Sequence, residues 1–201
     1  MTRRLVVAAA CVVALWGGAL GAQTTNWLTF GASATGIRLQ DQLATGVSSD
    51  VSGVALGASG GVDLGRVALA LGYWNGRLDA APGGTPQQDV IDGYALFVLR
   101  AAPWLSVKGG AEARSYVTPA GTERWVFWQG RLRAERTIVA PSVRGHVEIW
   151  RAFSTDVNTA GTVDRAQGGE VGLTLRRALG PFWVRMLYGI DDVRLTGSDR
   201  R

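Results

Sequence analysis

The chain has very little of several residue types that common protein classes need. Of its 201 residues only one is cysteine, Cys11, and only one is histidine, His146. A disulfide scaffold, a cysteine-ligated zinc site and a multi-histidine metal site are therefore excluded. After the first twenty or so residues, no apolar run approaches the ~20 residues that a membrane-spanning helix needs. A helical membrane bundle is excluded on that ground.

Charge is also sparse, since 18% of the residues are charged and 47% are hydrophobic. This composition, with eight tryptophans to bury, does not fit a disordered chain. What the sequence has instead is glycine, 28 residues of it, spread through segments of alternating hydrophobicity.

The first 22 residues have the three-part pattern of a secretory signal peptide. Residues 2–4 carry two arginines, residues 5–16 are apolar, and residues 17–22 are mostly small. We expect cleavage after Gly21 or Ala22. The alternatives are a core helix and a lipoprotein leader acylated at Cys11. Cleavage removes two arginines, so the formal charge falls from +5 to +3 and the basic character gives little support for nucleic-acid binding.

The rest of the chain, residues 23–201, is predicted to be one domain of β-strands. Apolar and polar residues alternate with a period of two between Gly and Pro residues, which is typical of strands with two different faces. We expect nine strands, with a bulge in the first near Gly36 and a fourth that is apolar on both faces. Their ranges are 27–40, 50–64, 66–76, 89–101, 104–117, 124–136, 142–152, 166–177 and 181–194.

Strand length and loop length favour a transmembrane barrel. Tilted strands of 11 to 15 residues are long enough to cross a bilayer, whereas soluble strands average about 5–6 residues. Four short connections alternate with four mostly longer, more polar ones at 41–49, 77–88, 118–123 and 153–165. Such asymmetry is typical of outer-membrane barrels. On these features the chain resembles small bacterial outer-membrane β-barrel proteins of the OmpA and OmpX type, without a diagnostic short motif. The resemblance implies an all-β, antiparallel, up-and-down transmembrane barrel.

The strand count departs from that resemblance. Barrels of this type have an even number of strands and both termini in the periplasm, which gives a range of 8–10 strands here. Nine strands leave the C-terminal residues outside the cell. The simplest hypothesis is a ten-strand barrel whose final strand is missing from this chain, and the alternative is eight strands with one element misassigned.

The polar faces are predicted to line the lumen with nearly balanced charge. An interior of this size is about wide enough to be filled by side chains, and confined opposite charges should pair. We therefore expect a lumen largely plugged by Arg/Glu pairs, with a narrow pore for small solutes such as anions as the alternative. The predicted network consists of Lys108, Glu112, Arg114, Arg131, Arg133, Glu135, Arg144, His146, Glu148, Glu170, Arg176, Arg185 and Asp191.

Aromatic residues gather near the predicted strand ends, as in the aromatic girdles of membrane proteins. The candidates for the membrane interface are Trp27, Tyr73, Trp104, Tyr116, Trp125, Trp150 and Phe182.

One constellation could support catalysis. His146 and Glu148 lie two residues apart and face the same side of a strand, as in a pair that orients an imidazole base. Lipid A deacylases of the outer membrane are small barrels with a Ser/His/Glu set, but Glu148 stands where their serine is expected. We therefore expect no enzyme activity, no catalytic residue, no cofactor and no metal site, with a lipid A-modifying enzyme kept as an alternative.

The sequence thus predicts an exported outer-membrane barrel with a structural, adhesive or surface role. Its expected partners are outer-membrane lipid and lipopolysaccharide, the export and barrel-assembly machinery during biogenesis, and no nucleic acid. A secreted soluble ligand-binding barrel is a further alternative. It requires the apolar faces to point inward and the charged faces outward.

Overall fold

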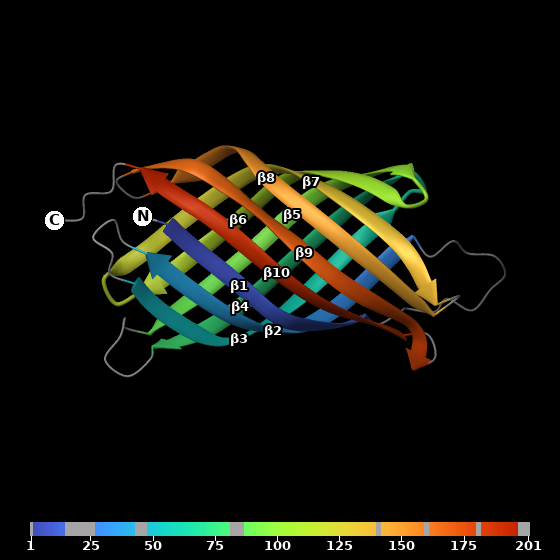
Figure 1. The fold of residues 1–201 in the computed structure, drawn as a ribbon, viewed down its shortest axis with the longest axis horizontal. Helices are drawn as coiled ribbons and strands as arrows, with labels where there is room; N and C mark the ends of the chain where they lie inside the picture. The colour runs from blue at the N-terminus through green and yellow to red at the C-terminus, as the bar shows by residue number, and fades with distance from the viewer. Residues whose placement is uncertain are drawn as a thin grey trace.

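The computed structural model shows a closed barrel of ten antiparallel strands (Figure 1). It describes residues 2–14, 27–42, 48–80, 87–139, 142–158, 161–179 and 182–196. Sequential strands pair with one another, and β1 closes the ring against β10. The strands are β1 (Thr2–Ala14), β2 (Leu28–Gln42), β3 (Ser48–Asp63), β4 (Val67–Ala80), β5 (Gln88–Ala102), β6 (Leu105–Thr118), β7 (Gly121–Val139), β8 (Val143–Val157), β9 (Thr162–Leu179) and β10 (Phe182–Thr196).

The connections after β3, β5, β7 and β9 are short and lie at one end of the barrel, here called the turn end, whereas the two-residue turn between β6 and β7 lies at the opposite end. The turn between β3 and β4 shows how the sequence builds a short connection. Gly65 has a φ of 84°, which glycine adopts without strain, and its N–H donates to Asp63 Oδ1 at 2.9 Å. Both Asp63 oxygens also accept from Arg100, at 2.8 and 2.5 Å, so this turn is tied to the end of β5. At the opposite end, here called the loop end, β1 begins and β10 ends (Figure 1).

The nine expected strands correspond to β2–β10, and the all-β antiparallel barrel is confirmed. Several strands run further toward the loop end than predicted. Residues 77–80 and 153–157, expected in long loops, belong to β4 and β8. The described part of the chain contains no helix long and apolar enough to cross a membrane.

The N-terminal segment departs from the expectation. Residues of the expected leader form β1, a 13-residue strand paired with β10 and β2. Without a strand there, β2 and β10 would each have an edge of unpaired backbone N–H and C=O groups. The β-branched valines of this run suit a strand. The segment therefore occupies the position, between the first and last expected strands, where a missing tenth strand was predicted. Cleavage of the segment as a signal peptide stays a prediction.

The bulge expected near Gly36 is wrong. β2 pairs with β3 without interruption from Leu28 to Gln42, and the irregularity lies in β1 between Ala8 and Ala10. The change of phase has another cause. Phe30 faces outward and is 55% exposed near the start of β2, whereas Ile37 and Leu39 face inward and are buried near its end. The apolar face of β2 thus changes sides while the strand stays regular.

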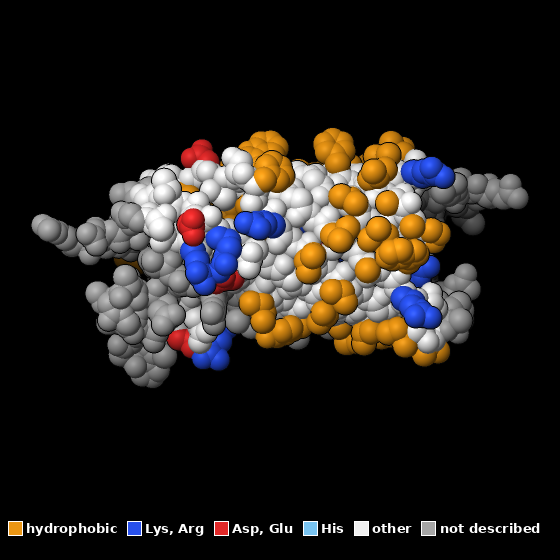
Figure 2. All heavy atoms as spheres, turned by 45° about the horizontal axis from the view of Figure 1, so that its top comes forward, with side chains coloured by type: hydrophobic (Ala, Val, Ile, Leu, Met, Phe, Trp, Pro, Cys, Tyr) orange, Lys and Arg blue, Asp and Glu red, His pale blue; other side chains and the backbone are white. Residues whose placement is uncertain are grey.

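The same reversal of face polarity occurs in other strands. In β4, Leu71 and Tyr73 face outward, and further toward the loop end Arg77 faces outward while Leu78 is buried. In β10, Tyr188 and Ile190 are exposed, whereas Val193 and Leu195 are buried. Figure 2 shows the result on the surface, where apolar side chains cover the turn-end part and the middle, acidic side chains lie nearer the loop end, and basic side chains lie toward both ends.

Inside the barrel, the loop-end part contains an apolar cluster. Its aromatic members form a chain of ring contacts, with centroids 5.9 Å apart for Tyr116–Trp125, 6.0 Å for Trp125–Phe127 and 6.2 Å for Phe127–Trp150. Aliphatic residues from β2, β3, β4, β5, β9 and β10 complete the cluster. At its loop end the barrel therefore has an apolar interior and a polar outer face, as a soluble protein does. Elsewhere the interior is polar and the outer face is apolar.

Candidate functional site in the lumen

The charged residues of β5–β10 that face inward lie next to the apolar cluster, toward the turn end. Their outward neighbours on the same strands are apolar and exposed, among them Leu132, Val147 and Ile149. In this part of the barrel the apolar faces therefore point outward and the charged faces inward, as the sequence predicts, whereas the loop-end part has the opposite arrangement. The site is a network of ion pairs inside a closed wall.

Arg114 on β6 is the centre of the network. Its Nε donates to Asp92 Oδ2 at 2.6 Å, and its Nη2 donates to Glu112 Oε1 at 2.6 Å and to Asp191 Oδ2 at 3.1 Å. The side chains of Arg114 and Asp92 are 5% and 2% exposed. Since β6 and β10 are four strands apart in the ring of ten, the contact with Asp191 crosses the lumen.

Arg131 on β7 links two buried glutamates. Its guanidinium lies 2.5 Å from Glu112 Oε2 and 3.3 Å from Glu148 Oε1, and its Cζ lies 5.9 Å from the ring centre of Trp150. Glu148 Oε2 also lies 2.5 Å from Lys108 Nζ, which reaches it from β6 past β7. Each glutamate is shared by more than one cation, so the pairs form a continuous chain across several strands.

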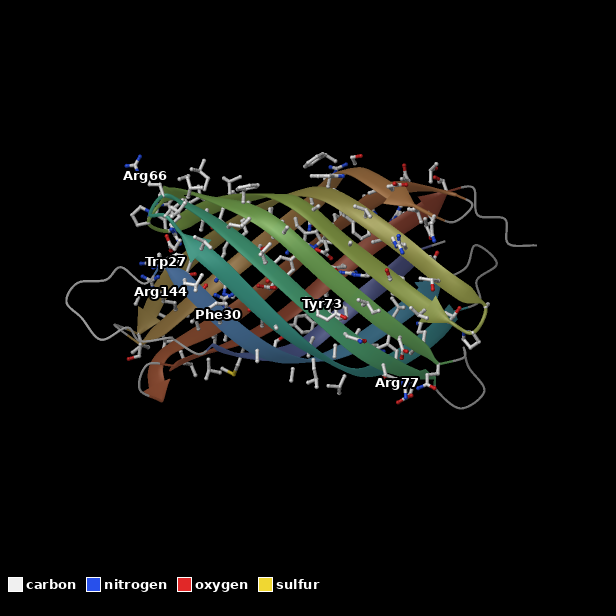
Figure 3. The ribbon with its side chains drawn as sticks, turned by 180° about the vertical axis from the view of Figure 1, so that it is seen from behind. Trp27, Phe30, Arg66, Tyr73, Arg77 and Arg144 are labelled. Carbon is white, nitrogen blue, oxygen red and sulfur yellow. The ribbon has the colours of Figure 1, made fainter. Side chains whose placement is uncertain are left out.

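Toward the turn end the network becomes more exposed. Arg133 lies 3.7 Å from Glu148 and 3.0 Å from Glu135, and Glu135 lies 2.9 Å from Arg144. The side chain of Arg144 is 36% exposed, and Figure 3 shows it at the turn end with Trp27 and Arg66, opposite Arg77. The strength of the pairing should therefore fall toward this mouth, because water screens exposed pairs.

His146 contacts a carboxylate on the neighbouring strand. Its Nε2 lies 2.8 Å from Glu170 Oε1 on β9, whereas Glu148 contacts Lys108 and two arginines. The imidazole also covers Gly172, where an added Cβ would meet ring atom Cε1 at 2.4 Å. The pair that could have supported catalysis, His146 and Glu148, is therefore not in contact, and His146 meets Glu170 on the neighbouring strand instead.

Small residues on the inner wall make room for the large ones. An added Cβ on Gly168 would lie 2.3 Å from Trp150 Nε1 and 2.4 Å from Asp191 Oδ1, the two atoms that form a 2.8 Å hydrogen bond across it. Likewise an added Cβ on Gly72 would lie 2.3 Å from the Tyr94 ring. These glycines are required for close packing inside the barrel.

The structure brings most of the predicted network together and adds two members. Asp92 and Gln129 are buried in it, the amide of Gln129 donating to Glu112 at 2.8 Å. Asp92 was missed because both faces of its strand are rich in apolar residues. The signal that could have found it is cross-strand register, which places Asp92 opposite Arg114. Arg185 lies on the inward face of β10, and the side chain of Arg176 lies outside the described residues.

The interfacial role predicted for three aromatic residues is wrong. Tyr116, Trp125 and Trp150 are buried in the apolar cluster at 3%, 1% and 7% exposure. Position near a strand end suggested the interface, but the period of two puts each on the same face as inward charged residues. Trp27 and Trp104 are both 58% exposed near the turn end, and Tyr73 is 52% exposed on the outer face. The side chain of Phe182 lies outside the described residues.

No group of three or more potential metal ligands occurs among the residues that the structure describes. The ion pairs described in the lumen join guanidinium, ammonium and imidazole groups to carboxylates.

Comparison with known proteins does not assign the chain to a family. No family model matches the chain, and no curated protein matches it. Among solved structures, the translocator domain of autotransporter NalP from Neisseria meningitidis aligns with a TM-score of 0.42 and 9% sequence identity. The alignment covers 96% of this chain and 88% of that chain. At this similarity neither a family nor a function is taken from it, and the OmpA/OmpX type stays a prediction.

Proposed function

We propose that this chain is an outer-membrane β-barrel protein with a structural or surface role and a lumen closed by side chains. The observation that carries the proposal is the reversal of face polarity along single strands. An apolar outer face around charged residues suits a lipid environment, and a polar outer face around an apolar core suits water. One strand that has both arrangements crosses from one environment to the other.

Strand length supports this assignment. A tilted membrane strand needs about 9–11 residues, whereas β4 has 14 and β7 has 19. The surplus lies toward the loop end, where the apolar cluster forms. We infer that this part extends beyond the bilayer into water and presents the loops for adhesion or other surface contacts.

Closure of the lumen is supported by two layers in series. The apolar cluster fills the loop-end part, and the Arg114–Asp191 contact crosses the interior beside it. A continuous water path would have to pass both. We therefore infer that the protein does not conduct ions. Since His146 contacts Glu170 rather than Glu148, we also infer that it is not an enzyme.

The test of membrane insertion is cell fractionation followed by gel mobility with and without boiling. We expect the protein in the outer-membrane pellet, resistant to carbonate extraction, with a different mobility when it is not boiled. A protein that is freely soluble and shows no mobility shift would overturn the proposal.

The test of closure is conductance in planar bilayers after the protein has inserted. We expect no stable single-channel steps from the wild-type protein. Regular steps that change in size in an Arg131→Ala variant would instead show the predicted narrow pore. Lipid A hydrolysis that is lost in a His146→Ala variant would show the enzyme.

A further inference from the structure

A groove of about 1330 Å³ lies on the outer face of the barrel near the turn end. Outward side chains of β7–β10 supply most of its lining, and Trp104 borders it from the turn between β5 and β6. Four residues on the inward faces of these strands also line it: Glu135, His146, Gly172 and Leu187. The apolar lining includes Ile138, Val147, Val171, Leu173, Met186 and Tyr188, all of them exposed. It lies in the apolar part of the surface, so on the proposed function it faces lipid.

Gly145 on β8 explains part of the hollow. A Cβ added there would meet Ile138 Cδ1 at 2.7 Å and Leu173 Cδ2 at 3.7 Å, both of them side chains of the lining. Gly145 therefore forms part of the floor because it has no side chain. A larger residue at this position would occupy space that the groove now leaves open.

A cation stands at the edge of the groove. Arg136 is one of its lining residues, is exposed, and forms no ion pair with any residue that the structure describes. In the view of Figure 2, only basic charged side chains are visible at this end of the barrel. The carboxylate in the lining, Glu135, is already paired with Arg133 and Arg144. The edge of the groove at Arg136 is therefore suited to an anionic group.

We propose that this groove binds one anionic phospholipid from the leaflet at the turn end. Its acyl chains lie along the apolar lining, and its phosphate is held by the Arg136 guanidinium beside Trp104. A guanidinium binds phosphate with two parallel hydrogen bonds, and tryptophan is favoured at the depth of lipid headgroups. The volume exceeds the ~300–1,000 Å³ of ordinary small-molecule sites, which suits a ligand with long chains.

This inference rests on the proposed function, so its test begins with insertion. The full chain is reconstituted into vesicles and checked by unboiled gel mobility. It is then purified in detergent, and native mass spectrometry counts phosphatidylglycerol or phosphatidylcholine of identical acyl chains retained on the protein. Failure to insert would overturn both proposals, whereas insertion without retained phosphatidylglycerol would overturn only this one.

Two variants with matched controls locate the site. Arg136→Gln should lower phosphatidylglycerol occupancy about tenfold, as expected for one lost charge-assisted contact, and Arg66→Gln should not, since Arg66 lies at another turn. Gly145→Val should lower retention of both lipids, because the valine side chain occupies part of the groove. The protein should still fold, since the Ile138 side chain can shift to admit the added Cβ. The control is Gly130→Val, where nothing lies within 4 Å of an added Cβ.

Three results would overturn the proposal. Equal retention of the two lipids by the wild-type protein would show only bulk lipid. Equal loss in Arg136→Gln and Arg66→Gln would show a diffuse charge effect. A wild-type dimer without lipid that becomes monomeric in Gly145→Val would show that a second copy occupies the groove. If Gly145→Val does not fold, the comparison of the two arginine variants decides.

Discussion

Removing the centre of the lumen network should destabilise the barrel far more than removing an exposed ion pair. Arg114→Met takes away the cation that contacts three carboxylates, and it leaves the buried carboxyl group of Asp92 without the cation that it contacts. Breaking a buried pair in this way costs about 3–5 kcal/mol. With a denaturant slope of about 2 kcal/mol per M, the urea midpoint should fall by roughly 2 M.

The assay is urea unfolding of the barrel in lipid vesicles, followed by tryptophan fluorescence and by unboiled gel mobility. The matched control is Arg77→Met, because Arg77 and Asp89 form a similar pair whose side chains are 68% and 44% exposed. An exposed pair contributes little, so its midpoint should stay near the wild-type value.

A second variant separates loss of the pair from loss of packing. Adding Asp92→Leu to Arg114→Met removes the uncompensated carboxylate, so part of the lost stability should return. Equal midpoints for Arg114→Met and Arg77→Met would refute the idea that the buried network holds the barrel. A double variant whose urea midpoint is no higher than that of Arg114→Met would refute the assignment of the cost to Asp92.

Three further predictions test the walls of the barrel. Gly168→Ala should lower stability by about 1–3 kcal/mol, because the added Cβ displaces a buried hydrogen bond; a loss no larger than that of Gly130→Ala would contradict this. Brominated lipid should quench Trp128, which is 50% exposed on the outer face, and spare Trp125. The fraction of tryptophan fluorescence that brominated lipid quenches should thus fall in Trp128→Phe and stay the same in Trp125→Phe. The reverse result would contradict the lipid-facing position of Trp128. Leu132→Arg on the outer face should cost about 2–4 kcal/mol in lipid vesicles, and an unchanged urea midpoint would argue against a lipid-facing position.

Much of the fold could be predicted because the signal is local. Alternation with a period of two shows in the sequence which residues share a face, and Gly and Pro mark the turns. This is why β2–β10, the inward position of Arg131 and Glu148, and the outward position of Leu132 were predicted correctly. The same alternation also predicts an inward position for Trp125, which lies an even number of residues from Arg131.

Other features could not be predicted because they depend on what lies across the barrel. The partners of Arg114 come from β5, β6 and β10, and no spacing along the chain relates Asp191 to Asp92. That His146 contacts Glu170 and not Glu148 depends on the register of β8 against β9. The groove on the outer face arises from four adjacent strands and one turn.

By itself, the amino-acid sequence determined the strands and their two faces, because backbone alternation needs only neighbouring residues. Tertiary structure alone decided that residues 2–14 close the ring, since only a ring with two unpaired edges creates a place for such a strand. It also showed that the apolar residues of β2 change from the outer to the inner face along a regular strand, without a bulge. Whether an inward position is apolar or charged depends on its height in the barrel, and height is set by the tilt and pairing of all ten strands.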